Sequence, residues 1–366
     1  MTDPVVSVAV AERVLALPRP LQLGPVEIRD RAYAVASVRT AAGFVGHAYC
    51  LTRNAPVQAL VERLVVPHVV GRDAEQVEAL WRTSQRANVL IARSGLALRA
   101  LALVDVALWD IRAQRAGMPL WRLLGASEGS APAMLVAAYP TPDRAPEAIA
   151  EEVLARSAAY GTPLLKVSRD PDPARMKVLL DHTQAGLDGS ALVVDAGFAW
   201  PDAATALSET ARWGDVPLAW LEDPLVPEDA EECRRVRRNG RHPVGAGDEV
   251  ADRRTYDALL ALDAVDVLRV DVMAVGGITP ALDVLHDADA AGVPVSFHVY
   301  PEVSVHLAAA QPTPAWAELF DPDVPGGNPY DPAHLLTVEA PRLRDGRLVA
   351  GDGAGLGLRL APAVAP

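Results

Sequence analysis

The chain has few cysteines and comparatively little positive charge. Only Cys50 and Cys233 occur among 366 residues, far apart in the sequence. Two such cysteines form no disulfide framework and do not have the spacing of a zinc site. Lys and Arg total 34 against 47 Asp and Glu, which gives a formal net charge of -13. Because no basic stripe is present to neutralise phosphates, this composition argues against nucleic acid as a partner.

Long apolar runs are also absent. The most apolar stretch, 96–109, contains Arg99 and Asp105 and is too short to span a bilayer. The N-terminal residues, interrupted by Asp3 and Arg13, do not read as a signal peptide. We therefore expect a soluble, cytoplasmic protein with no membrane partner. Half of the residues are hydrophobic, so a sizeable core can be buried.

The first third of the chain changes from strand-like to helical patterning. Residues 26–28, 34–38 and 45–49 read as strands of an antiparallel sheet. Residues 56–67 and 74–123 then follow helical periodicity with a wide apolar face.

From about residue 132, apolar strands alternate with helical stretches. Continuous apolar runs are typical of strands that are buried on both faces. Strands and helices that alternate without hairpin turns imply a parallel sheet. So many strands in order favour a closed barrel over a doubly wound sheet. The expected strands are 133–139, 163–167, 191–195, 218–222, 244–248, 267–271 and 293–298.

Acidic residues and one histidine recur at nearly even intervals in this second part. Subtraction of their sequence numbers gives gaps of 27, 26, 23, 27 and 20 residues, about the length of one strand–helix unit. A parallel barrel directs its strand ends into one mouth, and a ring of carboxylates there could not stay ionised without a cation. The series comprises Asp195, Glu222, Asp248, Asp271, His298 and Glu318.

The series divides by chemistry. Asp195, Glu222 and Asp248 offer hard oxygen ligands at consecutive strand ends, which suits Mg²⁺. A single acid after a strand is more often a helix cap, but three in register weaken that alternative. Asp271 and His298 follow on the next two strands. A carboxylate bonded to one imidazole nitrogen fixes the tautomer and raises the basicity of the other, so this pair is a candidate general base.

Two further ionisable residues border the proposed site. Lys166 ends an apolar strand, and it could hold a substrate carboxylate or act as a base with a lowered pKa. The alternative is a lysine whose stem merely covers apolar surface. Glu318 lies between Trp316 and Phe320, where a carboxyl group could stay protonated and donate to an oxyanion.

Several motifs at these positions are specific when taken together. They are Gly43–Tyr49, Leu221–Pro224, Gly247–Glu249, Asp271–Thr279, Ser296–Leu307 and Trp316–Glu318. They resemble the motifs of the enolase superfamily, mandelate racemase subgroup, over nearly the whole chain. The resemblance implies an α/β fold: a modified TIM barrel, (β/α)7β, with an α+β N-terminal capping domain that the C-terminal segment completes. The implied boundaries are 1–128 for the capping domain, 129–330 for the barrel and 331–366 for the returning segment. It also implies Mg²⁺ and a homo-oligomer.

The second barrel strand departs from the pattern of the subgroup. That strand usually ends Lys-x-Lys, and the second Lys is a base that faces the His across the substrate. Here it reads Lys166-Val167-Ser168, and Ser168 cannot accept a proton from carbon at neutral pH. Simple racemisation is therefore disfavoured unless Lys166 substitutes. Ala274 replaces the lysine of the muconate-lactonizing subgroup, and Gly197 replaces the more usual Asn, which opens space near the metal.

Dehydration needs only one base. His298 would abstract the proton α to a carboxylate held by Mg²⁺, with Lys166 and Glu318 stabilising the enediolate, and would then protonate the leaving β-hydroxyl. We therefore predict a lyase that dehydrates an aldonate or aldarate to a 2-keto-3-deoxy acid. The alternatives are a racemase or epimerase using Lys166 and His298, and, in another class, a metal-binding protein with an inactive site.

The small-molecule carboxylate substrate leaves a weaker signal in the sequence. A capping loop at 18–26 would cover the mouth, and its Arg19 and Gln22 could contact a distal carboxylate or hydroxyl, although surface exposure is the commoner role. Tyr139 and Ser168, on the first two barrel strands, are further candidate substrate contacts. Substrate length and mono- or diacid nature stay open.

Overall fold

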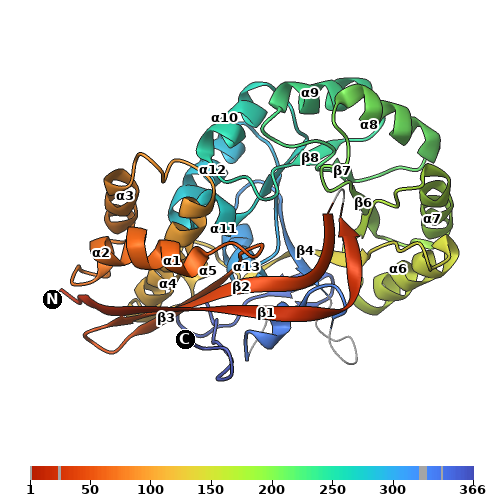
Figure 1. Ribbon diagram of the computed structural model, residues 1–366. Coiled ribbons are helices and arrows are strands. Elements are labelled where there is room, and N and C mark those ends of the chain that lie inside the picture. Colours follow the sequence, from red (N-terminus) through yellow and green to blue (C-terminus); the bar gives the residue numbers. More distant parts are fainter. Residues whose placement is uncertain (1, 24–25, 321–327, 339–340) are drawn as a thin grey trace.

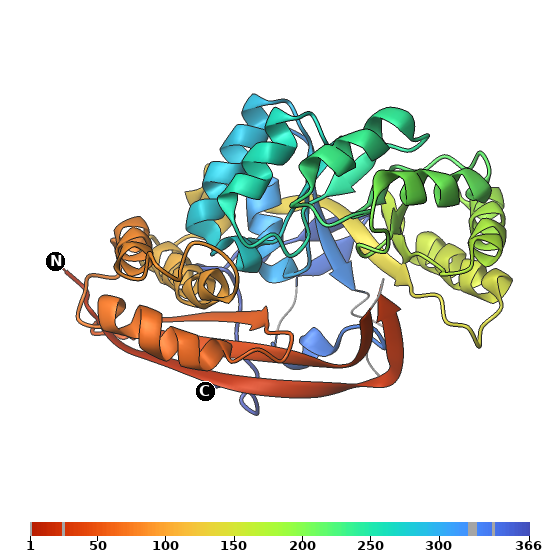
Figure 2. The ribbon, with the colours of Figure 1, turned by 45° about the horizontal axis from the view of Figure 1, so that its top comes forward.

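The computed structural model describes residues 2–23, 26–320, 328–338 and 341–366. A long antiparallel sheet with its helices lies beside a ring of parallel strands, and the far end of that sheet reaches the barrel (Figure 1). Figure 2 shows the same sheet running along one edge of the barrel. Within the described ranges, none of the helices combines the length and apolar character needed to traverse a membrane.

The N-terminal part is a three-stranded antiparallel sheet covered by helices. Its strand order is β1 (Val5–Leu23), β2 (Val26–Thr40) and β3 (Val45–Leu51). The buried helix α4 packs against β3, and at Gly46 a Cβ would lie 1.9 Å from Ala107 O, so only glycine permits this close approach. The helical elements are α1 (Val57–Leu60), a π-helical turn η1 (Val61–Val65), α2 (Val66–Val69), α3 (Val77–Ala87), α4 (Leu96–Arg115) and α5 (Leu120–Leu123).

The prediction of a loop at 18–26 is wrong for most of these residues. Residues 18–23 belong to β1 and Val26 begins β2, while residues 24–25 lie outside the described ranges. Pro18 and Pro20 are tolerated because β1 is an edge strand, where a missing N–H breaks no interior ladder. The pairing of β1 with β2 shifts register between Ala16 and Leu21, across these prolines.

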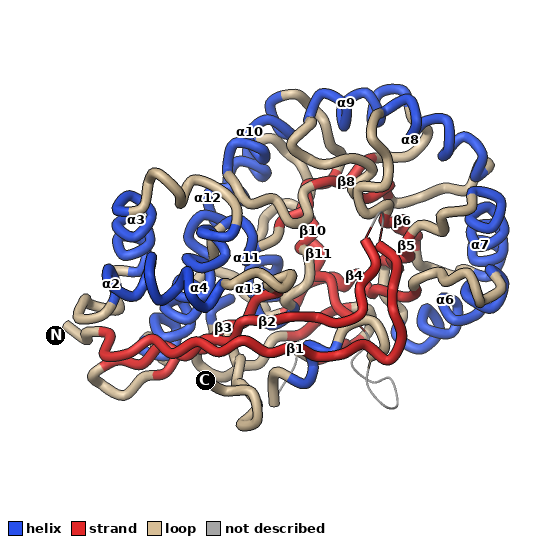
Figure 3. Tube along the Cα trace, viewed as in Figure 1, coloured by secondary structure: helices blue, strands red, loops and turns tan. Residues whose placement is uncertain are grey.

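The second part is a closed barrel of eight parallel strands surrounded by helices (Figure 3). β4 pairs with both β5 and β11, which closes the ring and confirms the predicted (β/α)7β barrel. The strands are β4 (Ser130–Ala138), β5 (Leu164–Ser168), β6 (Ala191–Asp195), β7 (Trp220–Glu222), β8 (Val244–Ala246), β9 (Val267–Val270), β10 (Val295–Phe297) and β11 (Ala315–Phe320). The helical elements between them are α6 (Pro146–Tyr160), α7 (Pro173–Gly186), α8 (Ala203–Thr210), η2 (Ala211–Trp213), α9 (Ala230–Asn239), α10 (Arg253–Ala261), α11 (Val272–Val275), α12 (Ile278–Ala290) and α13 (Pro301–Ala309).

The C-terminal segment contacts both parts. After the 3-10 turn η3 (Pro332–Leu335), it forms a short hairpin of β12 (Arg342–Arg344) and β13 (Arg347–Val349), and β13 pairs with the start of β4. Further on, Leu120 N donates to Gly355 O at 2.9 Å, and Leu356 N donates to Asp110 Oδ1 at 2.8 Å. The division at 128 and 330 stays a prediction.

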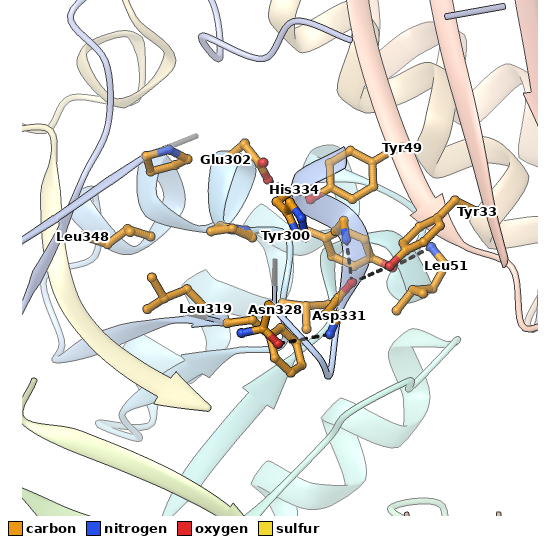
Figure 4. A pocket seen from close by; sticks show the side chains of 15 residues that line it. Tyr33, Tyr49, Leu51, Tyr300, Glu302, Leu319, Asn328, Asp331, His334 and Leu348 are labelled. Carbon is orange, nitrogen blue, oxygen red and sulfur yellow. Dashed lines mark hydrogen bonds between the residues drawn. The ribbon is translucent and has the colours of Figure 1, made fainter. Parts of the chain in front are cut away.

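Tyrosines join the capping sheet to the barrel. Tyr49 donates to Glu302 Oε2 at 2.8 Å, Tyr300 OH accepts from Leu51 N at 3.0 Å, and Tyr33 donates to Asp331. These residues line a small cavity of about 60 Å³ (Figure 4). The described lining of this cavity includes none of the predicted metal ligands. We therefore interpret the cavity as part of the contact between the capping sheet and the barrel.

Candidate active site

Three of the predicted acids and His298 line one cavity of about 590 Å³, whereas Glu222 and Asp271 are fully buried and are not part of its lining. Asp195 and Glu222 are the last residues of β6 and β7, and Asp248 follows β8 by two residues. His298 directly follows β10, whereas Glu318 lies inside β11 rather than at its end. The cavity lies between these strand ends and the capping strand β2. Its lining includes Asp195, Asp248, His298, Glu318, Lys166 and Tyr139 from the barrel, and residues 26–32 from the capping sheet.

Lys166 joins all three predicted metal ligands. Its ammonium nitrogen lies 3.1 Å from Asp195 Oδ2 and 3.7 Å from Asp248 Oδ2, and it also pairs with Glu222. Glu318 Oε2 lies 3.2 Å from the same nitrogen. Burial alone would lower the pKa of Lys166, but the surrounding carboxylates hold it well above its usual value. In this arrangement Lys166 is a charged cation rather than a base with a lowered pKa.

Arg269 is a second buried cation that the sequence interpretation missed. It is 0% exposed, and its Nε lies 2.9 Å from Asp248 Oδ1 and 3.1 Å from Glu222 Oε2. The same guanidinium pairs with Glu318 and donates to Ser296 Oγ at 2.6 Å. One signal was available, because a charged residue interrupts the apolar run 267–270. Its direction into the barrel could not be read from that run alone.

The pKa of Glu318 is lower than its aromatic sequence neighbours suggest. The expectation was a protonated carboxyl beside Trp316 and Phe320. Burial does raise its pKa, but the charges of Lys166 and Arg269 outweigh burial and lower it overall. The side chain is therefore a carboxylate in this structure, and its partners are cations rather than aromatic rings.

The acidic cluster fits a hard divalent cation. Oxygens of Glu222, Asp248 and Glu318 lie within 4.8 Å of one another, and Lys166 links Asp195 to the same group. Among the described residues, Glu222 Oε1 accepts no hydrogen bond although it is buried, and its contact with Lys166 is an ion pair. Burial raises the pKa of Glu222 to about 7. A group of buried carboxylate oxygens that already holds the Lys166 ammonium is an environment that also suits Mg²⁺, which prefers oxygen ligands.

Asp271 and His298 form the predicted dyad. His298 Nδ1 lies 2.9 Å from Asp271 Oδ2, which in the neutral ring assigns the proton to Nδ1 and leaves Nε2 as the acceptor. His298 Nε2 lies 3.8 Å from Asp248 Oδ2. Burial would lower the pKa of His298, but Asp248 and Asp271 raise it to about 9. Ala274 N donates to Asp271 Oδ1 at 2.8 Å and fixes this carboxylate at the start of α11.

Glu249 lies close to the dyad and forms a second acidic group with it. A carboxylate oxygen of Glu249 lies within 4.8 Å of ligand atoms of Asp271 and His298. Arg53 and Arg99 both pair with Glu249, and Arg99 reaches to 4.0 Å from Asp271 Oδ2. Arg53 and Arg99 thus balance the charge of this second acidic group, as Lys166 and Arg269 do for the first.

Backbone geometry positions Asp248. Gly247 adopts a φ of 136°, and a Cβ there would lie 2.1 Å from Arg269 O, so the chain can pass this point only at a glycine. The buried Asp223 carboxyl accepts from Gly247 N at 2.9 Å and from Asp248 N at 3.3 Å. The motifs Leu221–Pro224 and Gly247–Glu249 thus interact directly.

Of the predicted substrate contacts, Tyr139 lines the cavity, whereas Ser168 and Arg19 do not. Tyr139 lines the cavity and its ring centroid lies 5.0 Å from that of Tyr330. Ser168 is buried, is not part of that lining, and its hydroxyl has no hydrogen-bond partner among the described residues. Arg19 and Gln22 line a neighbouring cavity with Asp170 instead. Their roles toward substrate stay predictions.

The chain matches two family models that together cover most of its length. Residues 5–125 match "Mandelate racemase / muconate lactonizing enzyme, N-terminal domain", and residues 148–364 match "Enolase C-terminal domain-like". It is 29% identical over 335 residues to L-talarate/galactarate dehydratase of Salmonella typhimurium, which covers 91% of this chain and 81% of that protein. It is 26% identical over 361 residues to D-galactarolactone cycloisomerase of Agrobacterium fabrum, with coverage of 94% and 93%.

Solved structures show the same likeness. L-talarate dehydratase from a Polaromonas species, complexed with Mg and L-glucarate, superposes with a TM-score of 0.86. Its sequence is 28% identical, and the match covers 99% of this chain and 96% of that chain. The Mg in that complex agrees with the predicted cofactor, and the enzymatic relatives confirm the prediction of an enzyme. The chain belongs to the enolase superfamily, in the mandelate racemase/muconate lactonizing enzyme group.

Proposed function

We propose that this protein is a Mg²⁺-dependent dehydratase of acid sugars that yields 2-keto-3-deoxy acids. The observation that carries the proposal is the Asp271–His298 dyad beside the acidic cluster, with Ser168 at the position where a second lysine base would be needed. A single base suffices for dehydration, whereas 1,1-proton transfer needs one on each face of the substrate. Relatives in this family include a dehydratase of galactarate and L-talarate.

The metal would be held by Asp195, Glu222 and Asp248. When bound, Mg²⁺ supplies positive charge that acidifies the C–H bond next to the substrate carboxylate and stabilises the resulting negative charge. With the metal bound, Lys166 would pair with the substrate carboxylate instead of with these three carboxylates.

His298 would perform both proton transfers. Neutral Nε2 accepts the C2 proton, while Asp271 accepts the hydrogen bond from Nδ1–H and stabilises the imidazolium that forms. The imidazolium then donates its proton to the C3 hydroxyl as the C3–O bond breaks, which releases water. The remaining enol carries its hydroxyl on C2 and tautomerises to the 2-keto acid, so atoms and electrons balance.

An epimerase is the second candidate. Lys166 and His298 line the same cavity, so two ionisable groups could act on one substrate. Against it, negative charge keeps Lys166 protonated: four carboxylates surround its ammonium in this structure, and the substrate carboxylate would be its partner in the metal-bound enzyme. An epimerase would exchange the C2 proton of recovered substrate with solvent and interconvert epimers, without any loss of water. The further alternative, a metal-binding protein with an inactive site, predicts no reaction that depends on His298.

The experiment is a screen of aldonates and aldarates for 2-keto acid formation. We expect at least one substrate to react in Mg²⁺, to stop reacting in EDTA and to recover on Mg²⁺ addition. The His298→Asn variant should remove the product with that same substrate. Turnover that continues undiminished in EDTA would disprove the metal assignment.

A further inference from the structure

One buried arginine in the cavity has no acidic partner in the part of the chain that the structure describes. Arg31, on β2, is 4% exposed and lines the cavity of about 590 Å³ together with Lys166 and His298. Its one hydrogen bond within the described residues runs from Nη2 to Tyr330 O at 3.3 Å, and its buried Nε has no partner there. No described carboxylate comes within 4.0 Å of its guanidinium. A buried charge without a counter-ion is unfavourable unless a ligand supplies one.

The other capping arginines of this cavity are already paired. Arg29 lies 2.7 Å from Glu27, with 74% of its side chain exposed, and Arg53 pairs with Glu249. Asp331 also lines the cavity, but its Oδ1 accepts from Ala333 N at 2.8 Å and from the Tyr33 hydroxyl, as Figure 4 shows for Tyr33. Among the described residues of the capping wall, Arg31 is thus the one whose positive charge has no carboxylate within 4.0 Å.

The barrel residue Tyr139 lines the same cavity as Arg31. Tyr139 is 4% exposed and lines the same cavity, and no hydrogen bond to its hydroxyl is present within the described ranges. Its ring packs on Tyr330, whose backbone carbonyl accepts from Arg31. A guanidinium and a phenol together offer charged and neutral donors to one anionic group.

We propose that Arg31, assisted by Tyr139, binds the second carboxylate of a dicarboxylate substrate, so that the substrates are aldarates rather than aldonates. The reacting carboxylate would lie at the acidic cluster with Lys166, and the other end of the sugar at Arg31. A cavity of about 590 Å³ is of the size that holds a small ligand. This inference rests on the proposed function for the identity of the reacting end only.

The test measures binding without turnover. In the His298→Asn background with Mg²⁺, calorimetry compares six-carbon aldarates and aldonates paired by their C2–C5 stereochemistry. Adding Arg31→Gln should weaken aldarate binding about 10- to 100-fold, the range for losing charged hydrogen bonds, and change aldonate binding less than about threefold. Arg31→Lys should retain part of the aldarate affinity. Arg39→Gln, on the same strand but exposed and outside the cavity lining, should change neither ligand.

Each outcome decides one of the two claims. Equal weakening of both ligands, or no weakening of either, in a variant that keeps its circular dichroism spectrum and melting temperature overturns the Arg31 subsite. If the protein with His298 intact converts no acid sugar, but aldarate binding still depends on Arg31, the dehydratase proposal fails and the subsite stands. If acid sugars react and Arg31→Gln leaves the preference between aldarate and aldonate unchanged, only the subsite fails.

Discussion

Arg269 Nε lies 2.9 Å from Asp248 Oδ1, and this guanidinium is completely buried. Arg269→Leu would remove the buried guanidinium that pairs with Asp248, Glu222 and Glu318. Removing one partner from a buried ionic group costs about 3–5 kcal/mol, so we expect a loss of that order in the free energy of unfolding. Urea unfolding at pH 7 measures it.

The same measurement carries its own controls. Mg²⁺ should reduce the deficit of Arg269→Leu, because an ion that binds only the folded state stabilises that state. Arg241→Ala breaks a surface pair with Asp215, whose side chain is 93% exposed, and should cost at most about 1 kcal/mol. A cost for Arg269→Leu as small as that of Arg241→Ala would contradict a structural role for the buried guanidinium.

The pKa of His298 should respond to Mg²⁺. Burial opposes protonation, but Asp248 and Asp271 raise the pKa to about 9, so without metal the imidazole is protonated at neutral pH. A cation bound to Asp248 cancels part of that effect, and the pKa should decrease. NMR titration of labelled histidine, with His298→Asn used for assignment, measures both values. A pKa near 6.5 that Mg²⁺ does not change would contradict this electrostatic account.

Asp271→Asn should slow proton abstraction without removing Mg²⁺. The amide still holds the His298 ring but no longer stabilises the imidazolium, so kcat should decrease about 10²- to 10⁴-fold, the usual contribution of general acid–base catalysis. Mg²⁺ affinity measured by calorimetry should change little, because Asp271 is not among the proposed ligands. An unchanged kcat would show that the dyad is not the base.

Asp105 predicts a pH-dependent stability in the capping part. Burial raises its pKa from 3.8 to about 7, although Thr279 N and Oγ1 donate to it at 2.9 and 2.6 Å. Between these pH values the folded chain retains a proton that the unfolded chain has released, so stability decreases as the pH rises through the window. A shift of that size corresponds to at most about 4 kcal/mol.

The matched variant is Asp105→Asn, which keeps an acceptor for Thr279 N and does not titrate. Urea midpoints for both proteins at pH 5 and pH 8 should show that the wild type loses more stability with increasing pH than the variant does. The same pH dependence in both would mean that Asp105 does not hold the proton.

Much of the barrel could be predicted because its signals are local. A short apolar run that ends in an acid reveals both a buried parallel strand and the polar residue at its end, as for 191–195. The separate strands expected at 26–28 and 34–38 are one continuous strand, β2. Polar residues interrupt the apolar pattern between these two segments because residues 26–32 of β2 line the cavity.

The missed residues depend on long-range contacts. Arg269 matters because its side chain pairs with acids inside the barrel. Arg31 matters because β2 reaches the barrel mouth, where no described carboxylate pairs with its guanidinium. The partners of these two arginines cannot be predicted from the residues next to them in the sequence. The pKa of Glu318 is a similar case, since its aromatic sequence neighbours suggest protonation while two distant cations oppose it.

The central claim is that His298 removes the α-proton and that water then leaves. Proton NMR in D₂O with Mg²⁺ and a reacting acid sugar follows both events at once. We predict loss of the C2 proton signal together with the appearance of a 3-deoxy-2-keto acid deuterated at C3, and no reaction with His298→Asn. Deuterium at C2 of recovered substrate, with epimers formed and no 2-keto acid, would contradict the dehydratase and establish the epimerase.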